Sequence, residues 1–157
     1  MRRYGKESGF TIIELMIIVM IIGVLVALVL PNMRTSAARA RMTEAMLAFG
    51  PCRALVTEVY GASGDIPNPG EWGCEIAANA SQYVDSVQTT AEGTIKISLK
   101  GFNDLRIDFH TLTLAPLDNT GNLPSGNGAP VTRWRCGNGP TDGTDVPAQF
   151  LPSSCRG

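Results

Sequence analysis

Charged side chains are scarce in this chain of 157 residues, where Asp, Glu, Lys and Arg together make up 17%. Globular domains usually contain about 25%, so a large, highly solvated polyelectrolyte is excluded. The 13 basic residues nearly balance the 14 acidic ones, and the formal net charge is −1. Nucleic-acid-binding proteins are normally basic, so this balance argues against a whole-chain nucleic-acid binder. The hydrophobic share of 44% is ordinary and does not predict disorder.

Residue types that commonly build catalytic or metal sites are also few. The chain has a single histidine, His110, and its four cysteines include no C-x-x-C pair, so a zinc site is not expected. Asp142 and Asp145 could offer calcium oxygens, but two acids in a glycine-containing stretch are more simply a turn. No phosphate-binding loop or paired catalytic carboxylates are recognised. We therefore expect no metal, no cofactor and no enzymatic activity.

The polar residues are almost absent from one long segment near the N-terminus. Residues 10–30 contain only two polar side chains, Thr11 and Glu14, and the nine residues before them carry Arg2, Arg3 and Lys6. As a helix, 21 residues span about 31 Å, enough to cross a bilayer core, and the basic head favours export of the chain beyond the helix. A conventional signal peptide or an uncleaved anchor is the simple interpretation. Glu14 argues against this interpretation. A carboxylate costs roughly 3 kcal/mol at the bilayer centre, and less near the interface, so its presence in the segment predicts a partner for its charge.

The residues around Glu14 resemble a known family. Residues 9–17, GFTIIELMI, closely resemble the class III signal of type IV pilins. The resemblance implies that a prepilin peptidase removes residues 1–9 as a leader, cutting between Gly9 and Phe10, and methylates the new amine of Phe10. It also implies that Glu14 pairs with the N-terminal amine of an adjoining subunit during assembly.

The rest of the N-terminal helix is expected to extend to residue 60. Pro31 predicts a kink or a local break, and Gly23 weakens the same stretch. Resemblance to pilins implies that the segment between Gly23 and Pro31 is an extensible joint; a simple membrane-helix kink is the alternative. Residues 31–60 form an amphipathic part, which Gly50 and Pro51 should bend. Its apolar stripe consists of Ala38, Met42, Met46, Phe49, Val56 and Tyr60.

Residues 61–157 are expected to form a loop-rich head. Alternating polar and apolar residues predict strands at 94–100, at 105–110 with an extension to 114, and at 131–136. Their apolar face would consist of Ile95, Ile97, Leu99, Leu105, Ile107 and Phe109. A long kinked helix packed on this antiparallel sheet gives an α+β fold.

An even number of cysteines after an export signal predicts disulfides formed in an oxidising compartment. Three pairings are possible, and Cys52–Cys74 with Cys136–Cys155 is preferred because each closes a short loop. The 136–155 loop and its flanks resemble the terminal disulfide loop of type IVa pilins. That resemblance implies a recognition surface at Gly137, Asp142, Asp145, Gln149 and Ser153; a structural clasp at the sheet edge is the compatible alternative.

Together these features predict a structural polymer subunit resembling a type IVa major pilin. The resemblance implies a chain held in the bacterial inner membrane with its head in the periplasm, then assembled into an extracellular filament. Implied partners are copies of itself, prepilin peptidase, the inner-membrane assembly platform and a surface receptor, DNA or phage. Implied roles are adhesion, twitching motility and DNA or phage uptake.

Three alternatives stay open at this point: a minor pilin, a type II secretion pseudopilin, and a tip-located module that binds DNA or a host ligand. A solvated strand face balanced by Asp104 and Asp108 is the commoner arrangement, but DNA could bind to a basic strip on the polar face of the sheet. Its residues are Lys96, Lys100, Arg106, Arg133 and Arg135.

Overall fold

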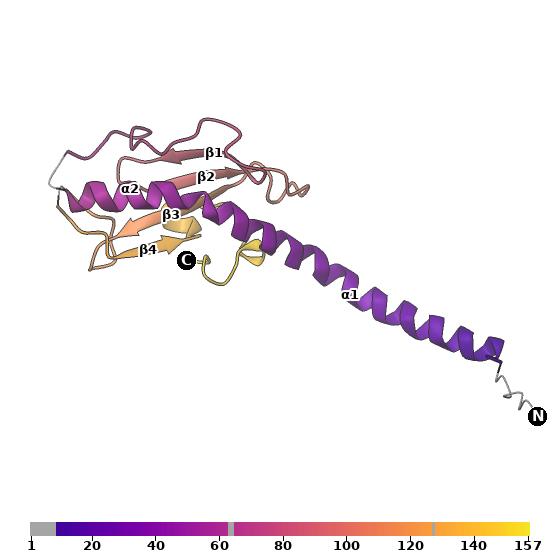
Figure 1. Cartoon of the computed structure of the whole chain (residues 1–157). Helices are drawn as coiled ribbons and strands as arrows, with labels where there is room; N and C mark the ends of the chain where they lie inside the picture. The colour runs from indigo at the N-terminus through magenta and orange to yellow at the C-terminus, as the bar shows by residue number, and fades with distance from the viewer. Residues whose placement is uncertain (1–8, 63–64, 127) are drawn as a thin grey trace, which may run out of the picture. The chain divides into compact units, whose positions relative to one another are not determined.

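The computed structural model describes residues 9–62, 65–126 and 128–157, without the side chains of residues 30–32 (Figure 1). Two compact units are distinguished, Met1–Thr35 and Ser36–Gly157, and each is considered by itself. Helix α1 (Ile12–Leu47) contributes its first part to one unit and its last turns to the other.

The first unit is an apolar helix. An 18-residue window, Ile12–Val29, has a mean hydropathy of 3.2, and none of it is buried. By length and composition this window is able to cross a membrane. Gly23 lies inside the helix, and the helical assignment continues through position 31. The local break that the sequence allowed at Pro31 is therefore absent, while a bend there stays a prediction.

The second unit is built on a four-stranded antiparallel sheet with strands in the order β1-β2-β3-β4. The strands are β1 (Val84–Thr89), β2 (Ile95–Leu99), β3 (Thr111–Leu117) and β4 (Arg133–Cys136). Helix α2 (Phe49–Gly61) packs against this sheet, and α3 (Gly139–Asp142) with the 3₁₀ turn η1 (Ala148–Phe150) comes after β4. The α+β fold expected from the sequence is confirmed.

The helix is interrupted at Ala48, slightly before the expected Gly50–Pro51 position. Pro51 has no N–H to donate to the carbonyl of Leu47, four residues earlier, and its ring crowds that carbonyl. The Ala48 N–H instead donates to the Ala45 carbonyl at 3.1 Å, a tighter turn. Pro51 itself lies in the first turn of α2, where a missing N–H costs nothing.

The predicted apolar stripe packs into the core. Met42, Phe49, Val56 and Tyr60 are only 0–3% exposed, and burial of each such side chain stabilises the fold by about 1.5–3 kcal/mol. Met42 and Phe49 pack in one cluster with inward-facing sheet residues, among them Val84, Val87, Ile95, Ile97, Leu99 and Leu112. Val56 and Tyr60 pack with Trp72 in a second cluster. The helical periodicity therefore identified the face that covers the sheet.

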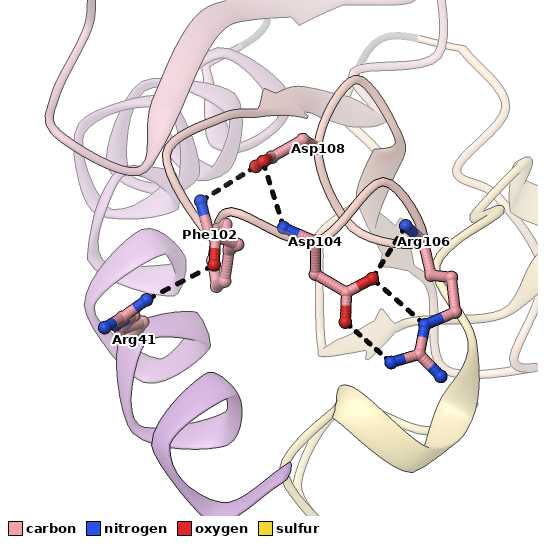
Figure 2. Close-up of polar contacts among 5 residues, drawn as sticks. All are labelled: Arg41, Phe102, Asp104, Arg106 and Asp108. Atoms are coloured by element: carbon pink, nitrogen blue, oxygen red, sulfur yellow. Dashed lines mark hydrogen bonds and ion pairs between the residues drawn. The ribbon is translucent and has the colours of Figure 1, made fainter. Parts of the chain in front are cut away.

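The expected strand at 105–110 is wrong. The Asp104 carbonyl accepts hydrogen bonds from the N–H groups of Ile107 and Asp108, both at 2.9 Å, so the chain curls into a helical turn. The Asp108 carboxylate accepts from the N–H groups of Phe102 at 2.8 Å and Asp104 at 3.4 Å and holds this curl (Figure 2). Local side-chain hydrogen bonds of this kind compete directly with strand formation.

This turn changes which residues are buried. Ile107 is fully buried, whereas Leu105 and Phe109 are 83% and 81% exposed and do not belong to the apolar face. Strand β2 lies between β3 and β1. The alternation of polar and apolar residues did not predict β1, whose sequence is VDSVQT.

Candidate functional site

The cleavage motif lies at the start of α1. Gly9, Phe10 and Thr11 precede the helix and are exposed, so the Gly9–Phe10 peptide bond is accessible and not helical. Glu14 lies in the first turn, where the Thr11 hydroxyl donates to its carboxylate at 3.3 Å. The structure thus places the expected cleavage bond, Gly9–Phe10, just before the helical turn that carries Glu14.

The apolar part of α1 has no cover within its own unit. Its large hydrophobic side chains between Ile12 and Val29 are 42–82% exposed and lie all around the helix. A soluble domain does not leave such a surface in water. Lipid or other apolar helices must therefore cover it. Glu14 is the one charged residue among positions 10–29, so the sequence supplies no cation for it inside this segment.

Two disulfides close the loops of the head. Cys52 in α2 is joined to Cys74, with Cα atoms 5.1 Å apart, and Cys136 at the end of β4 is joined to Cys155, with Cα atoms 4.5 Å apart. These are the two short-loop pairs preferred from the sequence. The first ties α2 to the segment before β1, and the second ties the last strand to the C-terminus.

The C-terminal loop, residues 136–155, extends the pairing of β3 beyond the end of β4. The Gly137 N–H donates to the Thr113 carbonyl, and the Asp145 N–H donates to the Thr111 carbonyl, both at 3.1 Å. The Thr113 N–H donates to the Thr144 hydroxyl at 3.1 Å. Helix α1 also holds the loop, because Arg39 Nε donates to the Gln149 carbonyl at 2.7 Å. This geometry is that of a structural clasp.

Two of the five expected recognition residues are structural instead. The Asp142 side chain is 2% exposed and accepts two hydrogen bonds of 2.7 Å from the Arg135 guanidinium, which raise the pKa of Arg135. Gly137 has φ +79°, and a Cβ there would lie 2.4 Å from the Cys155 carbonyl oxygen. Its role is close backbone packing. Asp145, Gln149 and Ser153 are exposed, and a recognition role for them stays a prediction.

The possible basic strip is largely neutralised by ion pairs. Lys100 lies 3.3 Å from Asp85, and Arg106 lies 2.7 Å from Asp104. Hydrogen bonds from the Arg106 side chain and backbone lower the pKa of Asp104 to about 2. Arg135 is paired with Asp142. With three of its five cations paired, the strip has little net charge to offer phosphates, and the DNA-binding alternative loses its main support.

Arg39 and Arg41 are positioning residues that no sequence pattern indicated. Both donate to backbone carbonyls: Arg39 to Gln149, and Arg41 to Phe102 at 3.3 Å (Figure 2). A sequence does not show whether an exposed arginine on a helix lies within reach of a loop carbonyl.

Among the residues that the structure describes, no three His, Cys, Asp or Glu side chains are grouped so as to hold a metal ion.

Glu75 organises the loop that carries the first disulfide. Burial of its carboxyl acts to raise its pKa, but hydrogen bonds from the Thr89 hydroxyl and from backbone N–H groups, including those of Trp72 and Cys74, outweigh burial and lower the pKa. A lowered pKa means that the stabilisation is fully present above about pH 4.5, the ordinary value, and is lost as the pH falls through the folded-state pKa.

Glu75→Gln is therefore expected to lower the free energy of unfolding at pH 7 by about 1–2 kcal/mol. The difference from the unmodified chain should shrink at pH 3, where Glu75 itself is protonated on unfolding. Chemical denaturation of the full chain in detergent at both pH values measures it, with the exposed Glu58→Gln as control. An equal difference at both pH values would show that the carboxylate charge is not what holds the loop.

Two different family models match the N-terminal segment and the head of this chain. Residues 38–156 match the model for the pilin family of bacterial filaments, and residues 5–30 match that for the prokaryotic N-terminal methylation motif. Fimbrial protein EcpC of Eikenella corrodens is 32% identical, with 96% of this chain and 91% of the relative covered. Type IV major pilin protein PilE1 of Neisseria gonorrhoeae is 35% identical, with 96% and 74% covered.

The family match spans most of the head, and the motif match spans the cleavage site and the uncovered apolar helix. Both relatives align along nearly the whole chain. The chain therefore belongs to the pilin family, and it is a structural subunit of a type IV pilus with the class III leader motif.

Proposed function

We propose that the chain is made as a precursor, inserted in the inner membrane and cut between Gly9 and Phe10, with methylation of the new amine. Residues 1–9 are the leader, 10–30 the membrane and filament-core part, 31–60 the amphipathic part, and 61–157 the head. The observation that carries this proposal is the uncovered apolar helix Ile12–Val29. Cleavage before this helix leaves it on the mature subunit, where lipid covers it first and neighbouring helices cover it later.

Glu14 sets the position of each subunit in this scheme. Cleavage creates a positively charged amine at Phe10, four residues from Glu14. Inside an apolar bundle the Glu14 carboxylate of one subunit pairs with the Phe10 amine of its neighbour, since each charge buried alone would be strongly unfavourable. Gly23 and Pro31 bound the stretch that we propose lengthens when the filament is pulled. The partners of this route are prepilin peptidase and the inner-membrane assembly platform.

We further propose that the chain is the major building block and acts by assembly, not by catalysis. The pilin family is structural, and relatives along nearly the whole chain are described as type IV major pilins. Adhesion and twitching motility are general roles of such filaments. The exposed Asp145, Gln149 and Ser153 on the C-terminal loop are the proposed contacts for a surface receptor, DNA or phage.

The mass of the intact chain extracted from membranes tests the processing step. The expected species begins at Phe10 and carries one added methyl group, and Gly9→Val should retain Met1 and lose the methyl group. Gly61→Val is a matched control, because Gly61 is exposed, lies outside the motif and has open space for a side chain. A wild-type chain that keeps residues 1–9, or one that begins beyond residue 30, would contradict the proposal.

A further inference from the structure

The loop between β2 and β3 presents an apolar tip that the fold does not need. Leu105 and Phe109, which we call the apolar tip, are 83% and 81% exposed, while Ile107 between them is buried. Two large apolar side chains this exposed on one short turn stabilise little within their own head. Their surface is available to another molecule.

The backbone of Phe109 is itself unfavourable. Phe109 has φ +68°, in the left-handed region. The two other described non-glycine residues with positive φ are Asn79 and Asn103, the residue type that tolerates this conformation best. A bulky aromatic residue there is both strained and exposed, so neither its conformation nor its burial favours the fold. Such a residue points to a role outside the head.

The turn that carries the apolar tip is rigidly held. Asp104 binds Arg106 through Nε at 3.0 Å and Nη2 at 2.7 Å, and Arg41 from α1 fixes the Phe102 carbonyl (Figure 2). The Arg106 guanidinium also lies over the Phe150 ring, 4.9 Å from its centre, which joins the turn to the C-terminal loop. A preorganised tip loses little conformational entropy when it binds.

The same head contains an apolar hollow at a different place. A cavity of about 460 Å³ lies between the α1–α2 junction and strands β3 and β4, within the size range that accommodates a small ligand or a few side chains. Its lining includes Leu47, Phe49, Leu114, Trp134 and Arg53. Leu47 is 73% exposed, and the Arg53 guanidinium lies 5.6 Å from the centre of the Trp134 ring. We call this cavity the Trp134 groove.

We propose that the apolar tip of one subunit inserts into the Trp134 groove of a neighbouring copy in the filament. The charges are complementary: residues 104–110 carry a net charge of −1, since the Arg106 guanidinium pairs with Asp104 and leaves the Asp108 carboxylate, whereas Arg53 is the charged residue lining the groove. A contact between two different surfaces of the same chain is heterologous, and such contacts build open-ended helical polymers. The proposal rests on polymerisation of this chain but not on its leader processing or on Glu14.

A photo-crosslinking amino acid at position 109 in otherwise unmodified filaments tests the contact directly. After illumination we expect a ladder of crosslinked copies, with the crosslink mapping to residues 46–53 or to Trp134 of a second copy. The same probe at Ile76, an exposed apolar residue outside the tip, is the control and should give no crosslink to the groove. Filaments whose position 109 crosslinks to another surface or another protein would overturn the proposal, as would filaments with no crosslink. Absence of wild-type filaments would instead contradict polymerisation itself.

Phe109→Asn separates this contact from a role in folding, because the two effects have opposite signs. Asparagine tolerates positive φ, so the unfolding midpoint of the full chain in detergent should rise by a few degrees. The temperature at which filaments dissociate should fall. Leu47→Asn in the groove should weaken filaments similarly, and the double variant should be no weaker than either single variant. Filaments of Phe109→Asn that are as stable as wild type, or additive losses in the double variant, would overturn the contact.

Discussion

Glu14→Val is expected to lower the yield of surface filaments by at least about tenfold while the chain is still made and inserted. The carboxylate is the one charge among residues 10–29, and valine removes its cost in lipid, which is below the roughly 3 kcal/mol of the bilayer centre because Glu14 lies in the first turn of the helix. Insertion should therefore be unimpaired. In the proposed pairing, valine leaves the neighbour's Phe10 amine buried and unpaired, and a loss of about 1.4 kcal/mol already gives a tenfold effect.

The measurement is the amount of chain in sheared filaments relative to the amount in membranes. Glu44→Val is the matched control, since Glu44 is an exposed acid later in the same helix, and it should assemble normally. Thr11→Val tests the local hydrogen bond to Glu14 and should have a much smaller effect than loss of the charge. Normal filaments from Glu14→Val would remove Glu14 from the assembly mechanism.

Replacing Cys136 and Cys155 together by serine is expected to lower the free energy of unfolding by about 3 kcal/mol. The bond closes a sequence separation of 19 residues, and restraint of the unfolded chain by a loop of this size gives a stabilisation of this order. The same bond holds the clasp against the first half of β3, where Gly137 and Asp145 supply backbone partners. Loss of the bond should therefore also loosen this edge of the sheet.

Denaturant unfolding of the full chain in detergent measures this loss. The Cys52/Cys74 pair replaced by serine serves as the comparison, because its sequence separation of 22 residues predicts a similar cost from chain entropy alone. The Thr111 N–H donates to the Asp145 carboxylate and the Thr113 N–H to the Thr144 hydroxyl. Amide hydrogen exchange at these two positions separates the two variants, since only the Cys136/Cys155 variant should expose them. A change below about 1 kcal/mol with unaltered exchange would show that the clasp is stable without its disulfide.

Sequence patterns predicted the elements that obey a strong local rule. The stripe containing Met42, Phe49 and Tyr60 repeats with the helical period, and burial of that stripe is what fixes the helices on the sheet. Strand β2 alternates regularly and was also found. The 105–110 segment alternates equally well, yet it forms a turn because Asp104 and Asp108 bind nearby backbone N–H groups. Alternation cannot reveal that competition, because it depends on which carboxylate reaches which amide.

In the candidate site, too, features set by local sequence could be predicted, and features set by tertiary contacts could not. The residues of the expected cleavage motif are close to one another in the sequence, and so are the two cysteines of each disulfide loop. Both features could therefore be predicted from local sequence. The resemblance of the 136–155 loop to pilins implies a recognition role for Asp142, but Arg135 on β4 holds Asp142 in a buried ion pair. Gly137 is required by the nearby carbonyl of Cys155, a contact made eighteen residues further along the chain. Both roles depend on tertiary contacts that no local pattern encodes.

Mass spectrometry of filaments sheared from the producing cells tests the central claim most directly. We predict that the dominant species is this chain starting at N-methylated Phe10 and lighter by four hydrogens for its two disulfides. That result would identify the chain as the processed, oxidised and principal building block of the filament. A chain that is abundant in the membrane but absent from the filaments, or present in them only as a trace, would contradict the account.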